Sequence, residues 1–359
     1  LFSFKKTIFT VLIILFAVFS FGQKKPILKG EKRLARFQEN SVLAQDTSFS
    51  NLHWQFVGPT NISGRCTDVE GISPRGNNYT IWVGSATGGV WKSINEGVTF
   101  ESVFDEMPTA SIGDIAIDPN NENVVWVGTG EANIFRSSNA GCGVFKTLDG
   151  GQSWKQMGLE DTHTIGRVVV DYSNSDIVYV AATGHEWTPN KERGLFKTSD
   201  GGKTWKKVLY INELTGISDF VMHPENPNIL YVAALGHLWN ANDERGVFKS
   251  MDGGKNWKKM TKDDGMPDGQ LGRIGVAFSR SMPSRVYAKV EATKNGFYKS
   301  DDGGYKWTLV NSNAADITDR PFYYQEIYVD PKNENRIYDV HSTITLSEDG
   351  GKSFSTLIP

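Results

Sequence analysis

From Leu52 to the end of the chain, short apolar runs alternate with polar turns at a steady spacing. In one stretch the runs are Ile115–Pro119, Val124–Gly130 and a third at 143–147, and a fourth begins at Trp154. This pattern lacks the period of an amphipathic helix. Four short runs in about 50 residues are typical of one blade of a β-propeller, so the pattern predicts an all-β fold of four-stranded blades.

One octet of sequence recurs six times at the same place in this pattern. It starts with Ser or Thr, contains Asp-Gly-Gly in five of the six copies, and closes with Trp or Phe. The copies begin 54, 51, 52, 50 and 47 residues apart. They are Ser93–Phe100, Thr147–Trp154, Thr198–Trp205, Ser250–Trp257, Ser300–Trp307 and Ser347–Phe354. A repeat of so constant a period predicts six visible blades.

The octet has the chemistry of a hairpin turn. Its Asp accepts hydrogen bonds from its own turn, its glycines allow positive φ, and we expect its aromatic residue to pack the fourth strand onto the blade. Six turns on the outside of six blades do not converge on one site, so we interpret the Asp residues as structural, not catalytic or calcium-binding. They are Asp149, Asp200, Asp252, Asp302 and Asp349. The first copy has Asn95 and Glu96 instead, which predicts a looser turn.

The first residues have the pattern of an export signal. Lys5 and Lys6 precede an apolar run, Thr7–Gly22, that ends in small residues before Gln23. We interpret residues 1–22 as a signal peptide, 23–51 as a polar linker with a short helix, and 52–359 as the propeller. A membrane anchor is the alternative, but the run is shorter than the roughly 20 residues that a span needs. The leader predicts a secreted, periplasmic or cell-surface protein without membrane contact after cleavage.

Composition narrows the choice of partner. Lys and Arg number 38 against 41 Asp and Glu, a net charge of −3, which is too even for a protein that binds a nucleic-acid backbone. Hydrophobic residues make up 39% of the chain, enough for a sizeable core. The two cysteines, Cys66 and Cys142, cannot form a disulfide framework or a cysteine metal cluster, and we do not expect them to pair. We expect no cofactor and no metal.

The octets resemble the Asp-box, or BNR, repeats of sialidases, of the sortilin/Vps10 luminal domain and of the xyloglucan-cleaving glycosidases of family 74. The segments His53–Arg65 and Ile81–Ser93 look most like secreted bacterial proteins of the sortilin and xyloglucanase group. The resemblance covers roughly Leu52 to Pro359 and implies a β-propeller. It does not imply one function, because enzymes, receptors and assembly factors share the repeat.

The segment Trp54–Val57 looks like the fourth strand of a blade, since the sequence around it resembles the segment that begins at Trp154. Propellers remove their open edges by completing one blade with a strand from the other terminus. The sixth repeat already has a fourth strand of its own at Ser353–Leu357. We therefore expect a seven-bladed propeller that is incomplete at the C-terminus by three strands. A closed ring of six blades, with Trp54 packed elsewhere, is the alternative.

A charged residue enters each innermost strand, and the sign of the charge alternates along the chain. In order, these residues are Arg65, Asp114, Arg167, Asp219, Arg273 and Glu326, of which Arg65 and Arg273 are aligned on a Gly-Arg pair and not on strict spacing. Opposite charges at strand ends predict Arg–carboxylate pairs between neighbouring blades. A polar rim at the channel mouth, where propellers bind ligands, is the alternative.

Two long loops between second and third strands, at 184–194 and 236–246, share a pattern typical of a binding surface. Their side chains, together with one from the corresponding loop of the preceding blade, are His185, Trp187, His237, Trp239 and Glu131. Trp rings stack on sugar rings and other flat apolar groups, so this face is the candidate binding surface. Alternatively, both Trp wedge between loops and each His caps local backbone. A His/His/Glu metal site has no supporting ligand spacing.

The sequence carries no clear catalytic pattern. The Arg-Ile-Pro signature of sialidases is absent, and Ala86 stands where the resemblance places the catalytic Asp of family 74. Glycoside hydrolysis generally requires two positioned carboxylates. We therefore expect a secreted, non-catalytic recognition propeller that binds a peptide, protein or glycan on its loop face or in its channel. The alternatives are a glycoside hydrolase with its acids in a missing part or at Glu131, Asp114 and Asp219, and a structural domain of a larger surface protein.

Overall fold

The computed structural model describes residues 29–43, 45, 47–49, 65–71, 79–133, 138–236, 240, 242–313, 316 and 321–358. The described residues form six four-stranded antiparallel sheets, and in each sheet the strands follow the order of the chain. The prediction of an all-β propeller with four strands per repeat is therefore confirmed.

Each sheet is one blade, numbered in chain order, and its strands run from the innermost to the outermost. Blade one consists of β1 (Cys66–Gly71), β2 (Ile81–Ser85), β3 (Gly89–Ser93) and β4 (Glu101–Ser102). Blade two consists of β5 (Ile112–Asp118), β6 (Asn121–Thr129), β7 (Val144–Thr147) and β8 (Lys155–Gln156). Blade three consists of β9 (Ile165–Val170), β10 (Val178–Ala182), β11 (Gly194–Thr198) and β12 (Lys206–Leu209). Blade four consists of β13 (Gly216–Met222), β14 (Leu230–Leu235), β15 (Gly246–Ser250) and β16 (Lys258–Lys259). Blade five consists of β17 (Leu271–Phe278), β18 (Val286–Ala292), β19 (Gly296–Ser300) and β20 (Thr308–Asn311). Blade six consists of β21 (Ile327–Val329), β22 (Ile337–Val340), β23 (Ile344–Ser347) and β24 (Ser355–Ile358). The helical elements are α2 (Gly30–Leu43), η1 (Thr47–Phe49) and η2 (Lys262–Asp264).

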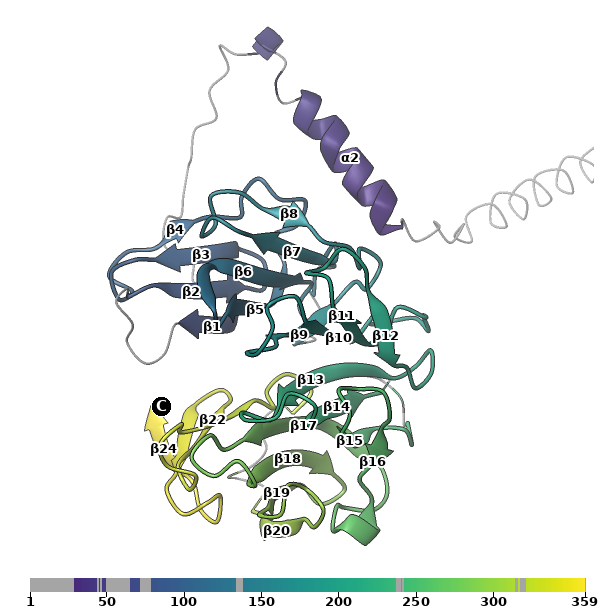
Figure 1. Cartoon of the computed structure of the whole chain (residues 1–359), viewed down its shortest axis with the longest axis vertical. Helices are drawn as coiled ribbons and strands as arrows, with labels where there is room; N and C mark the ends of the chain where they lie inside the picture. The colour runs from purple at the N-terminus through teal and green to yellow at the C-terminus, as the bar shows by residue number, and fades with distance from the viewer. Residues whose placement is uncertain are drawn as a thin grey trace, which may run out of the picture.

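The blades follow one another around a common centre (Figure 1). The innermost strand of each of the first five blades contacts the innermost strand of the next blade. This approach is close: a Cβ atom at Gly113 in β5 would overlap the carbonyl oxygen of Ile165 in β9. Only glycine fits such a position, so the sequence itself sets how tightly the blades surround the channel.

The hydrophobic core of the molecule lies between the blades. Among the described residues, five clusters of buried side chains each combine two successive blades. In the first interface, Trp82 and Val90 of blade one pack against Ile115, Val127 and Phe145 of blade two. Each of the five successive interfaces of the six blades therefore has its own core.

The octets form tight turns between the third and fourth strands of the blades. In the second copy, Asp149 Oδ1 accepts the Ser153 N–H at 2.9 Å and the Thr147 hydroxyl at 2.7 Å. The Thr147 oxygen accepts the Gly151 N–H at 2.9 Å, and Gly150 and Gly151 have φ of 68° and 93°. The same bonds recur at Asp200, Asp252, Asp302 and Asp349. Each carboxylate thus holds its own turn together.

The first octet keeps the same turn without an aspartate. Asn95 Oδ1 accepts the Ser93 hydroxyl and the Thr99 N–H, both at 2.9 Å, and its Nδ2 donates to the Thr99 hydroxyl. Glu96 adopts a φ of 60° at a position that is glycine in the other copies. The prediction of a looser turn is wrong, because an amide oxygen accepts the same hydrogen bonds as a carboxylate.

The aromatic residue that closes an octet connects two blades. Trp154 Nε1 donates to the carbonyl of Val103, just after the outermost strand of blade one, at 2.7 Å. The Trp154 ring meets Trp82 of blade one edge to face, with centroids 6.3 Å apart. Trp205 and Trp257 donate to their preceding blades in the same way. We expected this residue to pack the fourth strand onto its own blade, and Trp154 does pack in the cluster that contains Phe145 of its own blade. The contact with the preceding blade was not predicted.

Helix α2 lies in the segment for which a short helix was expected, and it docks on the turn that follows blade two. The Gly30 N–H donates to Asp161 Oδ1 at 2.5 Å, and the Arg33 guanidinium donates to the Glu160 carbonyl at 3.1 Å. Leu34 packs against the core between blades one and two. The part of the chain that the structure describes contains no helix long and apolar enough to cross a membrane.

The structure describes only some of the residues on which the predictions for the termini and the cysteines depend. The predicted signal peptide, residues 1–22, and the predicted strand Trp54–Val57 lie outside the described residues. The sixth repeat does have its own fourth strand, β24. Cys66 and Cys142 are free thiols, as expected.

Candidate functional site

Arg167 lies between acidic side chains of its two neighbouring blades. Its Nη1 donates to Asp114 Oδ1 at 3.1 Å, and its Nε donates to Asp219 Oδ1 at 3.2 Å. Each carboxylate also accepts a backbone N–H from the following blade: Val168 at 2.6 Å for Asp114, and Val276 at 3.0 Å for Asp219. The Arg–carboxylate ties that the alternating charges predict therefore occur at this point of the ring.

Burial is the largest influence on the pKa of Asp114 and on that of Arg167. It raises the pKa of Asp114 well above its usual value, although the charge of Arg167 opposes the rise. Burial also disfavours the charge of Arg167, yet Asp114 and Asp219 together raise the pKa of this guanidinium. The three side chains form one buried ionic network, and removal of one member would leave the others uncompensated.

Strand register places Asp68, and not Arg65, at the blade-one counterpart of Asp114. Asp68 Oδ2 accepts the N–H of Ile115 from the following blade at 2.9 Å, as Asp114 does with its own neighbour. An irregularity in the strand between Cys66 and Asp68 shifts the register. The same irregularity occurs in blade two, between Ile112 and Asp114. Alignment on the Gly-Arg pair missed Asp68 because Arg65 lies before β1, whereas Arg167 lies within β9.

Arg273 holds two loops together at the opening of the channel. In blade five the register places Gly275, two residues after Arg273, at the position of Asp114, so the sequence alignment was displaced here too. Arg273 Nη1 donates to the carbonyls of Phe322 at 3.2 Å and Tyr323 at 3.0 Å, and Nη2 donates to the Asn133 side chain. Burial lowers the pKa of Arg273.

Glu131 is the central residue of the channel mouth. Its two carboxylate oxygens accept Arg65 Nε at 2.9 Å and Nη2 at 2.7 Å, and Oε1 also accepts the Tyr323 hydroxyl at 3.3 Å. The hydrogen bonds to Glu131 raise the pKa of Arg65. Arg65 precedes blade one, Glu131 follows β6 of blade two, and Tyr323 precedes blade six. These three side chains tie together segments from three blades.

A second carboxyl group, Glu186, lies in the same region and was missed by the sequence analysis. Its residue is buried, and Oε1 has no hydrogen-bond partner among the described residues. Burial raises the pKa of Glu186 to about 7, and the charge of Glu131 contributes to the rise. The sequence offered no signal for this residue beyond its place between His185 and Trp187, because burial is a property of the tertiary fold.

The loop after β10 separates its two expected binding residues. The His185 ring stacks on His163 at 4.4 Å between centroids, and burial lowers the pKa of both, that of His163 to about 4. The Trp187 side chain, in contrast, is 60% exposed. His237 and Trp239 lie outside the described residues. The structure therefore places His185 in a packed, neutral pair and leaves Trp187 as the accessible surface of this loop.

Acidic residues continue along the channel below the mouth. Burial raises the pKa of Asp68 to about 6 and that of Glu70 to about 8, the latter also through the charge of Asp68. In blade six, Glu326 Oε2 accepts the Tyr328 hydroxyl at 3.3 Å. Glu326, just before β21, thus bonds to a residue of that strand. Asp68 and Glu70 therefore keep their protons to a higher pH than ordinary carboxyl groups do.

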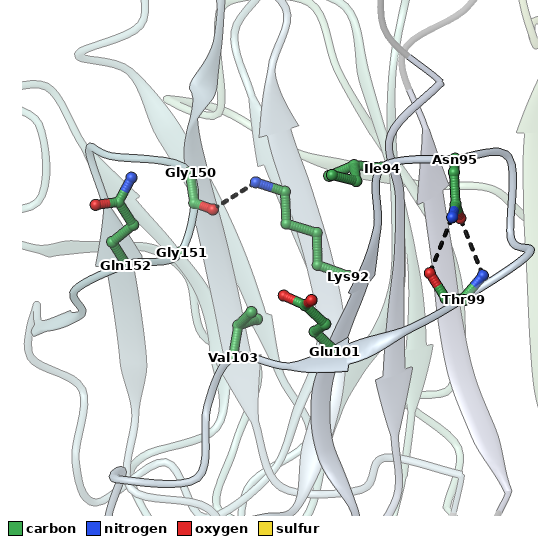
Figure 2. A pocket seen from close by; sticks show the side chains of 9 residues that line it. All are labelled: Lys92, Ile94, Asn95, Thr99, Glu101, Val103, Gly150, Gly151 and Gln152. Carbon is green, nitrogen blue, oxygen red and sulfur yellow. Dashed lines mark hydrogen bonds between the residues drawn. The ribbon is translucent and has the colours of Figure 1, made fainter.

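A pocket of about 290 Å³ lies at the outer rim, between the octet turns of blades one and two (Figure 2). Lys92 crosses it and donates to the Gly150 carbonyl at 2.7 Å. The same contact recurs where Lys197 and Lys249 donate to Gly253 and Gly303. Because several blades share this contact, we interpret it as a structural tie between blades. None of the residues that line the pocket is one of the predicted binding residues or lies at the channel mouth.

Comparisons with known proteins match this architecture. Residues 142–266 match the family model described as Sortilin, neurotensin receptor 3. An oligoxyloglucan-reducing end-specific xyloglucanase of Emericella nidulans is 24% identical over 293 residues, which cover 63% of this chain and 36% of that protein. The match thus spans little more than a third of the length of this relative.

Solved structures show the same fold at low sequence identity. The GH74 enzyme of Niastella koreensis has a TM-score of 0.57 at 19% identity, covering 82% of this chain and 45% of that one. A structure of YCF48 bound to D1 peptide has a TM-score of 0.51 at 14% identity, covering 77% and 78%. The chain is therefore an Asp-box β-propeller that is similar to sortilin-type and xyloglucanase-type propellers.

Proposed function

We propose that the chain is the recognition propeller of an exported protein, and that it binds a peptide, protein or glycan at the channel mouth without acting on it chemically. The supporting observation is that charges at the mouth are engaged in ties between blades. Arg167 bridges Asp114 and Asp219, and Arg65 holds both oxygens of Glu131. Charged side chains that bond to one another hold the loops in position. We therefore assign contact with the ligand to the exposed side chains next to them.

Trp187 is such an exposed group. It is 60% exposed on the same loop as Glu186, and the loop is anchored by Arg193, whose guanidinium donates to the carbonyls of Thr183 and His185. A Trp on an anchored loop offers a flat apolar face to a sugar ring or an apolar side chain, and it loses little conformational entropy on binding.

The relatives support two classes of ligand. A YCF48 propeller of similar fold was solved with a peptide, and the names of the related enzymes refer to xyloglucan. Both classes suit an aromatic platform beside hydrogen-bonding loops. The binding experiment therefore offers both.

The experiment screens the full chain against peptide and glycan arrays and monitors sugar release in the same samples. Trp187→Ala is expected to weaken binding of the selected ligand by at least about tenfold. Leu148→Ala, at an exposed octet position on the outer rim, is the matched control and is expected to bind like the parent. Ligand binding that Trp187→Ala leaves unchanged would contradict this placement of the site, and sugar release would contradict the absence of catalysis.

Glycoside hydrolysis is the second candidate, because Glu186 is buried and the charge of Glu131 contributes to the rise in its pKa. A carboxyl group that keeps its proton near neutral pH can act as a general acid when a partner carboxylate lies close by. If this function is correct, the chain releases oligosaccharides from xyloglucan, and both Glu186→Gln and Glu131→Gln abolish the release while the fold is retained.

We also propose that residues 1–22 direct export. The Lys-Lys start and the apolar run are typical of a secretory leader. Expression of the chain in a bacterium, followed by N-terminal sequencing of the exported product, is expected to give a mature end near Gln23. Retention of the leader in the membrane fraction would favour an anchor.

A further inference from the structure

Glu186, on the loop between β10 and β11, is a buried carboxyl group with an unpartnered oxygen. The residue is 8% exposed, and its Oε1 has no hydrogen-bond partner among the described residues. Burial raises the pKa of this carboxyl group, and the negative charge of Glu131 raises it further. Buried polar atoms in native proteins almost always have a partner. The unpartnered oxygen therefore points to a group that arrives with a ligand.

The basic side chains of this region are engaged elsewhere. Arg65 donates two hydrogen bonds to Glu131, at 2.9 and 2.7 Å. The guanidinium of Arg193 donates to backbone carbonyls of its own loop. The His185 ring lies in a stacked histidine pair, and burial lowers its pKa, so it is mainly neutral at pH 7. In the described part of the chain, none of these side chains donates to Glu186 Oε1.

Exposed apolar side chains occur on the same loop and on the loop beside it. Trp187 directly follows the carboxyl residue and is 60% exposed. Tyr210 and Leu214, between β12 and β13, are 42% and 39% exposed. The Asn190 N–H donates to the Glu213 carbonyl at 3.0 Å, which holds the two loops side by side. The two loops thus combine a buried carboxyl group with apolar surface.

The chemistry of this arrangement favours an organic cation. A sugar hydroxyl can donate a hydrogen bond to a carboxylate, but it cannot neutralise a buried negative charge. A Lys ammonium or an Arg guanidinium does both. The aliphatic stem of either side chain can also lie along an aromatic ring. A basic peptide therefore matches both parts of this surface.

We propose that Glu186 determines the specificity of the channel mouth by selecting a cationic side chain, so that the ligand is a peptide that carries Lys or Arg. This inference rests on the proposed function and assigns the peptide class in preference to the glycan class. The basic group forms an ion pair with Glu186, and an apolar residue of the peptide packs on Trp187 and Leu214. A ligand without the charge leaves the buried carboxyl group unpartnered, so the pair discriminates between ligands.

A proton competes with such a peptide for Glu186. The pKa of Glu186 is about 7, so the carboxyl group is largely protonated at lower pH, whereas a Lys ammonium keeps its charge. Affinity for a basic peptide is therefore expected to rise by about tenfold between pH 6 and pH 8. The other charged or titratable side chains of the region are Glu131, Arg65, Tyr323, His185 and Arg193.

The test uses an array of hexapeptides in matched pairs, which differ only in whether each lysine is free or acetylated, together with xyloglucan oligosaccharides. Acetylation removes the charge of the lysine and keeps its stem. We expect the full chain to be captured by peptides with free lysine. Isothermal titration calorimetry of a captured pair at pH 7.5 should show that acetylation weakens binding by at least about tenfold.

Two variants then assign the charge selection to one residue. Glu186→Gln keeps the size of the side chain and removes its charge. It is expected to bind free-lysine peptides no better than acetylated ones, with no pH dependence. Glu192→Gln, at a partly exposed position on the same loop, is the matched control and is expected to bind like the parent. The acetylation comparison needs no variant, so it tests the charge even if Glu186→Gln does not fold.

Three results would overturn this inference and leave the proposed recognition function intact. They are equal binding of free and acetylated peptides, capture by the oligosaccharides alone, and a folded Glu186→Gln variant with the parent's affinity and pH dependence. A chain that captures no member of the array would contradict both the inference and the proposed function.

Discussion

Arg65 and Glu131 form a two-point ion pair at the channel mouth, with Nε–Oε1 and Nη2–Oε2 distances of 2.9 and 2.7 Å. The Glu131 side chain is fully buried, whereas Arg65 is partly exposed. Glu131 also accepts the hydroxyl of Tyr323, which precedes blade six. One carboxylate therefore bonds to segments next to the first and the last of the described blades.

Loss of the cation at this pair is expected to destabilise the fold. Arg65→Met should lower the free energy of unfolding by about 2–3 kcal/mol, because the buried carboxylate of Glu131 is left without its cation. Little stability is recovered at position 65 itself, because the Arg65 side chain is partly exposed. Arg65→Lys keeps the charge but loses the second bond, so it should cost roughly half as much. Urea denaturation measures both. A Met variant as stable as the parent would show that the pair contributes no net stability.

The carboxyl groups of blade one predict that the free energy of unfolding falls as pH rises. The pKa of Glu70 is raised to about 8 by burial and by the charge of Asp68, whereas a Glu in an unfolded chain titrates near 4.3. Because the pKa of Glu70 is higher in the folded chain than in the unfolded chain, protonated Glu70 favours the folded state. This contribution to stability is complete below about pH 4 and is lost as the pH rises through about 8. Glu70→Gln mimics the protonated form and should flatten the decline of Tm between pH 5 and pH 9.

The control for this pH series is Glu122→Gln, at an exposed position at the start of β6. It removes the same charge from the surface and should leave the slope unchanged. If both variants give the parent's slope, the pH dependence does not come from Glu70.

The indole of a closing octet residue is expected to stabilise the interface between two blades. Trp205→Phe keeps an aromatic ring of smaller size and removes the hydrogen bond of 2.6 Å to the Met157 carbonyl in the preceding blade. The expected loss is about 1 kcal/mol, the net value of one such bond. Trp187→Phe at the exposed loop should change stability by less than about 0.5 kcal/mol. Thermal unfolding of both variants compares the two positions directly.

The close approach of innermost strands predicts a severe effect from one methyl group. Gly113→Ala places a Cβ on the Ile165 carbonyl of the next blade, so the strands must separate, at a cost of roughly 3 kcal/mol. Gly71→Ala is the control, because its Cβ would meet only the Thr80 carbonyl oxygen at 3.6 Å, an ordinary contact. Equal stability of the two variants would mean that the blades can shift apart without loss.

The blades could be predicted from sequence because the octet is satisfied locally. In each turn the Asp or Asn, the first Ser or Thr and the glycines bond to one another within a few residues. Local chemistry of this kind repeats visibly along a chain. The same argument also explains the error at Asn95, where residue identity changed but the accepting oxygen did not.

The channel mouth could be predicted only in part. The alternating charges indicated the Arg167 ties, because opposite charges recur at one strand position. The contact of Glu131 with Tyr323 joins residues 192 positions apart, and no local pattern records it. Asp68 was missed because Arg65 lies before β1, whereas Arg167 lies within β9, and the burial of Glu186 is a property of the tertiary fold.

The serial arrangement of the five apolar cores has a consequence for how the molecule opens. Among the residues that the structure describes, each central blade has apolar cores on both sides, whereas blades one and six each take part in one. In such a linear array, cooperativity passes only between nearest neighbours, and fraying starts at the ends. Amide protons of β2 and β22 should therefore exchange with deuterium well before those of β10 and β14, so that protection reaches its maximum in the middle repeats.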